Sequence, residues 1–177
     1  MRIVGGKYKG RVLTEFNGKD IRPTSDMARE SIFNILQFRI IDKCFLDLFC
    51  GTGAMGIEAL SRGAKSVTFN DADRRSLSVL KENLNKLGIT EGIKVFNLDA
   101  ITLLKNAEKK YDYIYIDPPY KTDLGIRALK VITGALSDNG VVIFEDEKPF
   151  KEQIDGLKIV DQRKYGRICL TFFSKGE

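Results

Sequence analysis

From residue 44 onward the sequence alternates between short apolar runs and helical patterns, and this alternation constrains the fold more than any other feature. The runs "CFLDLF", "SVTFND", "IKVFNL", "YDYIYI" and "GVVIFE" each predict a strand, and helices are expected over 54–63, 73–87, 101–108 and 124–136. Strands that alternate with helices form a parallel sheet with right-handed crossovers. Two later runs, "LKIVDQ" and "RICLTFF", predict further strands joined near Tyr165 and Gly166. The sequence therefore predicts an α/β fold.

The segment before this alternation is treated as an extension of the α/β body. Residues 1–13 predict short strands around a turn at Gly5 and Gly6. The stretch "RPTSDMARESIFNIL" predicts a helix, because a proline and capping oxygens precede an apolar stripe at helical spacing. That stripe consists of Met27, Ile32, Ile35 and Leu36. We therefore divide the chain into a basic β-hairpin and helix extension over 1–40 and a domain over 41–177.

The positive charge of the chain is concentrated at its start. The net charge is +5, and residues 1–22 hold six basic side chains against two acidic ones. Such a segment suits a phosphate backbone, and its candidate RNA contacts are Lys7, Lys9, Arg11 and Arg22. Charge alone slightly favours the simpler interpretation of a solvated face.

Composition excludes several classes of protein. The chain of 177 residues suits one domain, and it has no histidine, which excludes a catalytic histidine and suggests no metal site. Its three cysteines form no C-x-x-C pair and fit a reducing compartment. No apolar run approaches the ~20 residues that cross a bilayer, and the start lacks the apolar core of a secretory signal. We expect a cytoplasmic monomer.

A glycine loop follows the first strand of the alternating region. It reads Gly51-x-Gly53-x-x-Gly56 and is expected to join a strand to a helix, the context of a nucleotide-type cofactor site. Asp47, near the end of that strand, would repel the pyrophosphate of a dinucleotide but suits the ammonium and sulfonium of S-adenosylmethionine. The alternative is that Asp47 caps the turn through backbone N–H groups.

Two more acids follow the next strands. Asp71 lies twenty residues past Gly51, a spacing at which an acid can accept both ribose hydroxyls, although Asn70 competes for this role. Asp73 is expected to cap the following helix. Asp99 could accept the adenine amino group or cap its own helix. Because the carboxyl ends of parallel strands line one crevice, we expect these loops to converge.

The stretch "YIYIDPPYKTD" ends a buried strand with two prolines between an acid and a tyrosine. Proline fixes φ and holds the residue before it extended, so Asp117 and the nearby carbonyls are presented rigidly as acceptors. Two acceptors can hold the two hydrogens of a planar exocyclic amine and push electron density onto its nitrogen. Tyr120 can stack on the base. This pattern favours methyl transfer to a base that is single-stranded or flipped out, over a merely rigid loop with Tyr120 in the core.

These segments resemble a known family. The glycine loop with "DPPY" is typical of class I S-adenosylmethionine-dependent amino-methyltransferases. The segments "RIVGGKYKGRVL", "RPTSDMARESIFNIL", "FLDLFCGTGAMGIEALSRGA" and the late "KYG" resemble the RsmD-type 16S ribosomal RNA guanine-N2 methyltransferases nearly end to end. The resemblance implies a Rossmann-like seven-stranded sheet with a small N-terminal β extension. It also implies a guanine in small-subunit ribosomal RNA, or in an assembling 30S particle, as the substrate.

The resemblance also implies roles for individual residues. S-adenosylmethionine, which leaves as S-adenosylhomocysteine, would contact a set formed by Asp47, Phe49, Gly51, Gly53, Asp71, Asp99 and Ala100. The target guanine would be held by Asp117, Pro118 and Tyr120. The chain departs from the family in reading "FNDAD", where a glutamate is usual at the end of the second strand, and this leaves the ribose contact open between Asn70 and Asp71.

Three other functions compete with guanine-N2 methylation. Adenine-N6 methylation of DNA or RNA is the nearest, because "DPPY" serves either amine, although the chain offers no separate DNA-recognition domain. A nicotinamide-dependent oxidoreductase is disfavoured by Asp47 before the loop. An RNA-binding module that has lost catalysis is disfavoured by the intact "DPPY".

Overall fold

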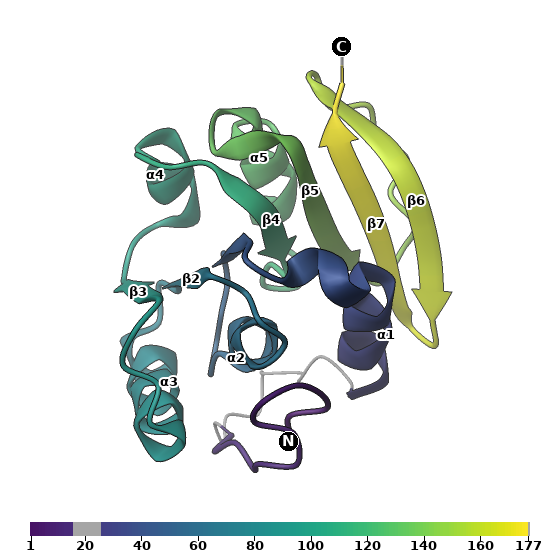
Figure 1. The fold of residues 1–177 in the computed structure, drawn as a ribbon. Helices are drawn as coiled ribbons and strands as arrows, with labels where there is room; N and C mark the ends of the chain where they lie inside the picture. The colour runs from purple at the N-terminus through teal and green to yellow at the C-terminus, as the bar shows by residue number, and fades with distance from the viewer. Residues whose placement is uncertain (16–25, 177) are drawn as a thin grey trace.

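The computed structural model describes residues 1–15 and 26–176, and it contains a seven-stranded sheet (Figure 1). The strand order is β3-β2-β1-β4-β5-β7-β6, in which neighbours from β3 to β5 are parallel and β7 runs antiparallel to both β5 and β6. The strands are β1 (Cys44–Asp47), β2 (Ser66–Asn70), β3 (Ile93–Phe96), β4 (Tyr111–Ile116), β5 (Leu136–Asp146), β6 (Leu157–Tyr165) and β7 (Ile168–Lys175). The predicted α/β architecture with seven strands is confirmed.

Helices cover both faces of the sheet, and α1 and α5 lie on opposite sides of it in Figure 1. The helices are α1 (Asp26–Leu36), η1 (Gln37–Ile40), α2 (Ala54–Ser61), α3 (Arg74–Leu87), α4 (Ala100–Lys105), α5 (Leu124–Leu129) and η2 (Ile132–Gly134). Side chains alternate across each strand, so Phe45 packs in the core beneath α1, α2 and α3, and Leu46 packs in the core beneath α4 and α5. No helix within residues 1–15 and 26–176 is long and apolar enough to cross a membrane.

Several elements differ from the sequence predictions. The helix expected over 124–136 stops at Leu129 and continues as the short helix η2, because β5 already begins at Leu136. The buried residues of α1 are Ala28, Arg29, Ile32, Phe33 and Leu36. Met27 lies off this face and is 65% exposed, so its assignment to the apolar stripe was wrong.

The strands expected over 1–13 reduce to one antiparallel bridge between Arg2 and Val12. Side chains of α2 and α3 form hydrogen bonds with backbone groups of residues 1–15 instead. Ser61 donates its hydroxyl to the Gly5 carbonyl at 2.5 Å and accepts the Tyr8 N–H at 2.9 Å. Asn83 accepts the Thr14 N–H at 2.7 Å, which holds the end of the segment.

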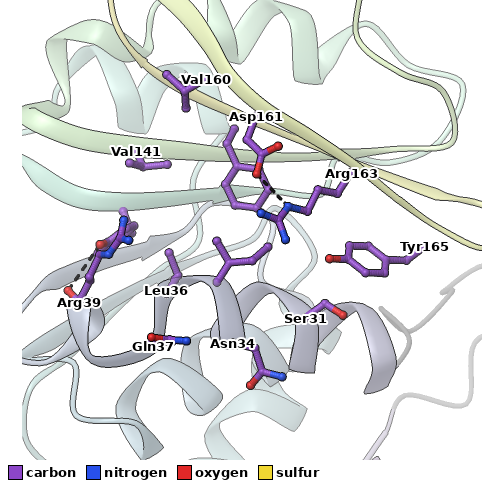
Figure 2. Close-up of a pocket in the computed structure, with 13 residues that line it drawn as sticks. Ser31, Asn34, Leu36, Gln37, Arg39, Val141, Val160, Asp161, Arg163 and Tyr165 are labelled. Carbon is purple, nitrogen blue, oxygen red and sulfur yellow. Dashed lines mark hydrogen bonds and ion pairs between the residues drawn. The ribbon is translucent and has the colours of Figure 1, made fainter.

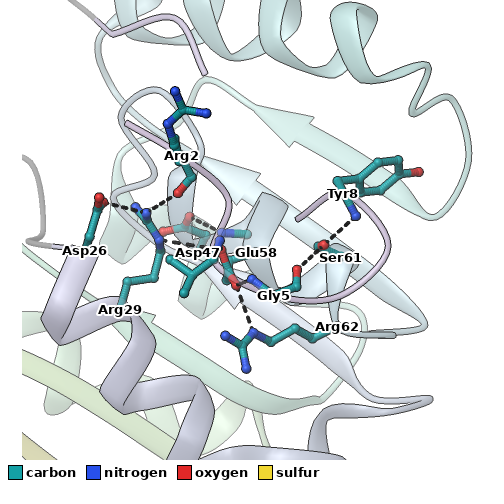
Figure 3. Close-up of polar contacts among 11 residues, drawn as sticks. Arg2, Gly5, Tyr8, Asp26, Arg29, Asp47, Glu58, Ser61 and Arg62 are labelled. Carbon is teal, nitrogen blue, oxygen red and sulfur yellow. Dashed lines mark hydrogen bonds and ion pairs between the residues drawn. The ribbon is translucent and has the colours of Figure 1, made fainter. Parts of the chain in front are cut away.

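A fully buried carboxylate, Glu58 of α2, is the centre of these contacts (Figure 3). Its two oxygens accept the N–H groups of Val4 and Gly5, each at 2.8 Å. The same carboxylate pairs with Arg62 Nε at 2.8 Å and faces Arg29 Nε at 3.6 Å. Arg29, itself 1% exposed, donates to the Arg2 carbonyl at 2.5 Å. One buried charge therefore ties the leading segment and α1 to the helix that follows the glycine loop.

Replacing Glu58 by Gln should destabilise the protein strongly. Glutamine keeps the shape but removes the charge that the buried Arg29 faces, and losing one partner of a buried pair costs about 3–5 kcal/mol. Urea unfolding of the variant would measure this loss. The matched control is Glu82→Gln on α3, whose pair with Lys86 is half exposed and should contribute little. Equal stability of the two variants would contradict the role of Glu58.

Close packing of α2 on β2 depends on Gly56. A Cβ at this helical position would lie 2.3 Å from Cε1 of Phe69, a fully buried ring that has no room to move. Gly56→Ala should therefore destabilise the protein by about 1–3 kcal/mol, although alanine favours helices. Gly134→Ala is the control, because a Cβ there meets nothing within 4 Å. Thermal or chemical unfolding of both variants tests the account, and a neutral Gly56→Ala would contradict it.

Candidate active site

A cavity of about 580 Å³ opens at the carboxyl ends of β1, β2 and β4. The strand order reverses between β1 and β4, and ligands of open α/β sheets bind at such a point. The structure brings nearly all the predicted catalytic and cofactor residues to its wall, namely Asp47, Phe49, Gly51, Asp71, Asp99, Ala100, Asp117, Pro118 and Tyr120. The expected convergence of the four loops is therefore observed.

The glycines of the loop have different tasks. Gly51 (φ +52) lies on the cavity wall, and a Cβ there would meet nothing within 4 Å, so the bare backbone leaves that space open. Gly53 does not line the cavity. It precedes α2 with φ +89, and a Cβ would lie 2.2 Å from Leu80 Cδ1. Gly53 therefore shapes the turn and its packing, and it is not placed against the cofactor space where it was expected.

Asp47 lies at the floor of the cavity and is 1% exposed. Its Oδ2 accepts the Gly56 N–H at 2.9 Å, which is the turn-capping bond that the sequence left as an alternative. Burial raises the pKa of Asp47 to about 7, against the lowering effect of that bond, and the charge of Asp71 adds to the rise. Burial and the nearby Asp71 therefore disfavour the ionised form of this carboxyl group.

Asp71 and Asn70 have distinct environments. Asn70 is 1% exposed, and its amide donates to the carbonyls of Leu48 and Leu98 and accepts the Leu98 N–H. Its side chain therefore connects the loop after β1 to the loop after β3. Asp71 accepts the N–H groups of Gly51 and Asp73, each at 2.8 Å. A carboxylate can accept about four hydrogen bonds, so Asp71 keeps capacity toward the cavity.

Two further acids act as helix caps. Asp73 accepts the Arg75 N–H at 3.0 Å, as predicted. Asp99 accepts the Thr102 N–H at 2.9 Å and its hydroxyl at 3.1 Å, and these bonds, the backbone one first, lower the pKa of Asp99. Asp99 therefore caps its own helix, as one of the two interpretations predicted, and it also lines the cavity.

The "DPPY" loop leaves β4 at one side of the cavity. Pro118 packs against α5, since a Cβ on Gly125 would lie 2.7 Å from its Cγ. The Thr122 hydroxyl donates to the Pro119 carbonyl at 2.7 Å, and Lys121 has φ +61, so the turn closes tightly after Tyr120. Tyr120 is 37% exposed. The alternative that places Tyr120 in the core is therefore wrong.

The leading segment forms part of the same site. Met1 lines the cavity, a placement the sequence gave no signal for, because it depends on contacts with α2. Lys7, Lys9 and Arg11 are exposed on this segment, and Arg11 donates to the Lys86 carbonyl at 3.0 Å. Arg22, also predicted to contact RNA, lies outside the described residues. Tyr115 on β4 was missed as a wall residue, although its position two residues before Asp117 could have indicated it.

Comparison with known proteins extends this picture. The family model described as "Conserved hypothetical protein 95" matches residues 1–174. The ribosomal RNA small subunit methyltransferase D of Buchnera aphidicola subsp. Baizongia pistaciae is 38% identical over 157 residues, which cover 87% of this chain and 80% of that protein. The protein of the same name from Escherichia coli K12 is 34% identical over 149 residues, covering 83% of this chain and 75% of that protein.

Solved structures share the whole fold. The yhhF structure from Escherichia coli superposes with a TM-score of 0.87 at 27% identity and covers 99% of this chain and 97% of that one. A Thermus thermophilus protein, TTHA0928, gives a TM-score of 0.84 at 28% identity and covers 98% and 99% of the two chains. The described N-terminal segment and the β6–β7 hairpin therefore both belong to a fold that these proteins have in common.

The raised pKa of Asp47 predicts an unusual pH dependence of stability. Between pH 4 and 7 the folded protein keeps a proton on Asp47 that the unfolded chain releases, so the free energy of unfolding contributed by this group falls as pH rises. The slope approaches about 1.4 kcal/mol per pH unit. Asp47→Asn should remove it, and denaturation of both proteins at pH 5 and pH 8 measures the difference. If the wild type and Asp47→Asn differ in free energy of unfolding by the same amount at both pH values, the raised pKa of Asp47 would be contradicted.

Proposed function

The chain belongs to the family of ribosomal RNA small subunit methyltransferase D, and we propose that it transfers a methyl group from S-adenosylmethionine to the N2 amine of a guanine in small-subunit ribosomal RNA. The family resemblance read from the sequence is confirmed. The observation that carries the proposal is the meeting of Asp47, Asp71 and the "DPPY" loop in one cavity. Asp47 and Asp71 would face a positively charged cofactor, and the neighbouring "DPPY" loop would hold a planar amine.

The acids of the cavity fit the chemistry of the cofactor. S-adenosylmethionine, when bound, supplies an electrophilic methyl group on a positively charged sulfur. The charge of Asp71 adds to the raised pKa of the buried Asp47, so a positive group beside the two acids relieves their repulsion and a pyrophosphate would increase the negative charge there. Asp47 would face the methionine part and Asp71 the ribose. Asp99 and Ala100, at the start of α4, would face the adenine.

The "DPPY" loop prepares the acceptor nitrogen. The Asp117 carboxylate and the carbonyl of Pro118 accept the two N–H bonds of the amine, and this draws electron density onto nitrogen. The prolines restrict the backbone, so the acceptors are arranged before the substrate arrives. The exposed ring of Tyr120 at the cavity wall stacks on the base and sets its height. Catalysis then depends mainly on positioning.

The RNA must present its base outside a helix. A base within a duplex cannot enter a cavity walled by the "DPPY" loop, so the target guanine is single-stranded, looped or flipped out. The exposed Lys7, Lys9 and Arg11 lie on the segment whose Met1 reaches the cavity wall, and they would contact phosphates beside the target. Small-subunit RNA as the substrate is supported by the names of the relatives.

Asp117→Ala should lower turnover by at least about 100-fold, since it removes an acceptor aimed at the amine. Affinity for S-adenosylhomocysteine, measured by calorimetry, should stay within a few-fold. Asp123→Ala is the control, because Asp123 is an exposed acid of the same loop region that pairs only loosely with Arg127, at 3.8 Å. Radiolabelled methyl transfer to small-subunit RNA, followed by nucleoside analysis, gives the readout.

Two results would contradict the proposal at different points. Unchanged turnover of Asp117→Ala would refute the role of this carboxylate. Methyladenosine as the sole product would refute guanine as the substrate and favour adenine-N6 methylation, which the same loop can support.

A further inference from the structure

A second cavity, of about 690 Å³, lies between the α1–η1 segment and strand β6 (Figure 2). It is separate from the candidate active site and forms an open groove over the sheet. Asn34, Gln37 and Arg39 border it on the helical side, and Asp161, Arg163 and Tyr165 border it on the strand side. We call this feature the α1–β6 groove.

The groove results from two local irregularities. The β6–β7 ladder shifts register between Ile159 and Asp161, so Val160 is an extra residue in β6. After this bulge, Asp161, Arg163 and Tyr165 pair with Phe172, Leu170 and Ile168, whose side chains all belong to the core beneath α1. On the other wall Gln37 has φ +43, which ends α1 and begins the tighter turn that carries Arg39. Both walls therefore direct polar side chains into the same space.

The groove and the candidate active site are both lined by residues of β4. Tyr113 lines the groove and Tyr115 lines the cofactor cavity, and both side chains lie on the same face of the strand. Two residues of a strand span roughly 7 Å, so the two sites are neighbours. The turn after Tyr165 lies at the same edge of the sheet as the end of β5, where Asp146 pairs with Cys169. The groove therefore lies beside the candidate active site, over the same face of the sheet.

The groove offers the groups that hold single-stranded RNA. Arg39 and Arg163 are exposed, and the bond from Arg163 Nε to Asp161, at 2.8 Å, leaves other N–H donors of the guanidinium for a phosphate. Of the four basic side chains in residues 157–167, Arg163 lines the groove, which holds Arg39 and Arg163 against one acid, Asp161. Asn34 and Gln37 add amide groups, and the partly exposed ring of Tyr165 provides a stacking surface where β6 ends. Cations that follow a groove with an aromatic platform are typical of single-strand binding.

We propose that the α1–β6 groove binds the single-stranded RNA that flanks the target nucleotide, an inference that rests on the proposed function. Phosphates would contact Arg39 and Arg163, and a base would stack on Tyr165. The groove thereby gives the enzyme a second hold on its substrate, in addition to Lys7, Lys9 and Arg11.

The test uses a fluorescent single-stranded oligouridine of about twelve nucleotides, which contains no guanine to methylate. The double variant R39E/R163E should weaken its binding on the order of tenfold or more. It should also make the slope of log affinity against log salt less steep by about 1.4, as expected for two lost phosphate contacts. The control K105E/K130E changes the net charge equally, with both residues exposed on α4 and at the end of α5, and should bind as the wild type does.

A second measurement separates stacking from charge. Tyr165→Ala should weaken oligouridine binding on the order of tenfold, whereas Tyr165→Phe should retain it, since the ring alone stacks. Photo-crosslinking with 4-thiouridine in the same RNA should mark peptides within 31–39 and 157–165. Because these readouts involve no methyl transfer, their failure is distinct from failure of the proposed enzyme activity.

Equal weakening by R39E/R163E and K105E/K130E, or crosslinks confined to other peptides, would overturn the proposal. So would sedimentation that shows a wild-type dimer and a monomeric R39E/R163E variant, because the occupant would then be a second copy of the chain.

Discussion

Two carboxylates hold the glycine loop, and the geometry of the cofactor cavity depends on them. Asp47 accepts the N–H of Gly56, and Asp71 accepts the N–H of Gly51, so each acid fixes one end of the turn that forms the cavity wall. The same bonds bring the partly buried Asp71 close to the buried Asp47. Their repulsion contributes to the raised pKa of Asp47. The two acids that shape the glycine loop therefore also make the cavity favourable for a cation. This preference fits the positively charged sulfur of S-adenosylmethionine.

A second buried charge connects this cavity to the surface expected to meet RNA. Glu58 lies on the helix that the glycine loop begins, and it binds the backbone of the leading segment on one side and Arg29 of α1 on the other (Figure 3). Because of this arrangement, Met1 reaches the cavity and the exposed basic residues lie nearby. Helix α1, fixed by the same contacts, also forms one wall of the α1–β6 groove. Cofactor site, leading segment and groove therefore share one polar anchor.

Features that depend on hydrophobic periodicity or on the residues of a single loop were predicted from the sequence. The alternation of apolar runs gave the strands, the parallel order made the acidic loops converge, and the Asp73 cap was assigned from position alone. Features that depend on partners distant in the chain were not predicted. Residues 1–13 form one antiparallel bridge, and much of their backbone bonds to Glu58 and Ser61 of α2, so the hairpin prediction overestimated the strands. The α1–β6 groove joins segments more than a hundred residues apart and depends on a bulge at Val160, for which the local sequence carries no clear signal.

The account rests on an acidic pocket that places a methyl donor opposite the acceptors of the "DPPY" loop. A crystal structure with S-adenosylmethionine bound tests this most directly. We predict the sulfonium near Asp47, the ribose at Asp71, and the methyl group directed across the cavity toward the carboxylate of Asp117. A cofactor bound elsewhere, or one whose methyl group points away from Asp117, would contradict the central claim.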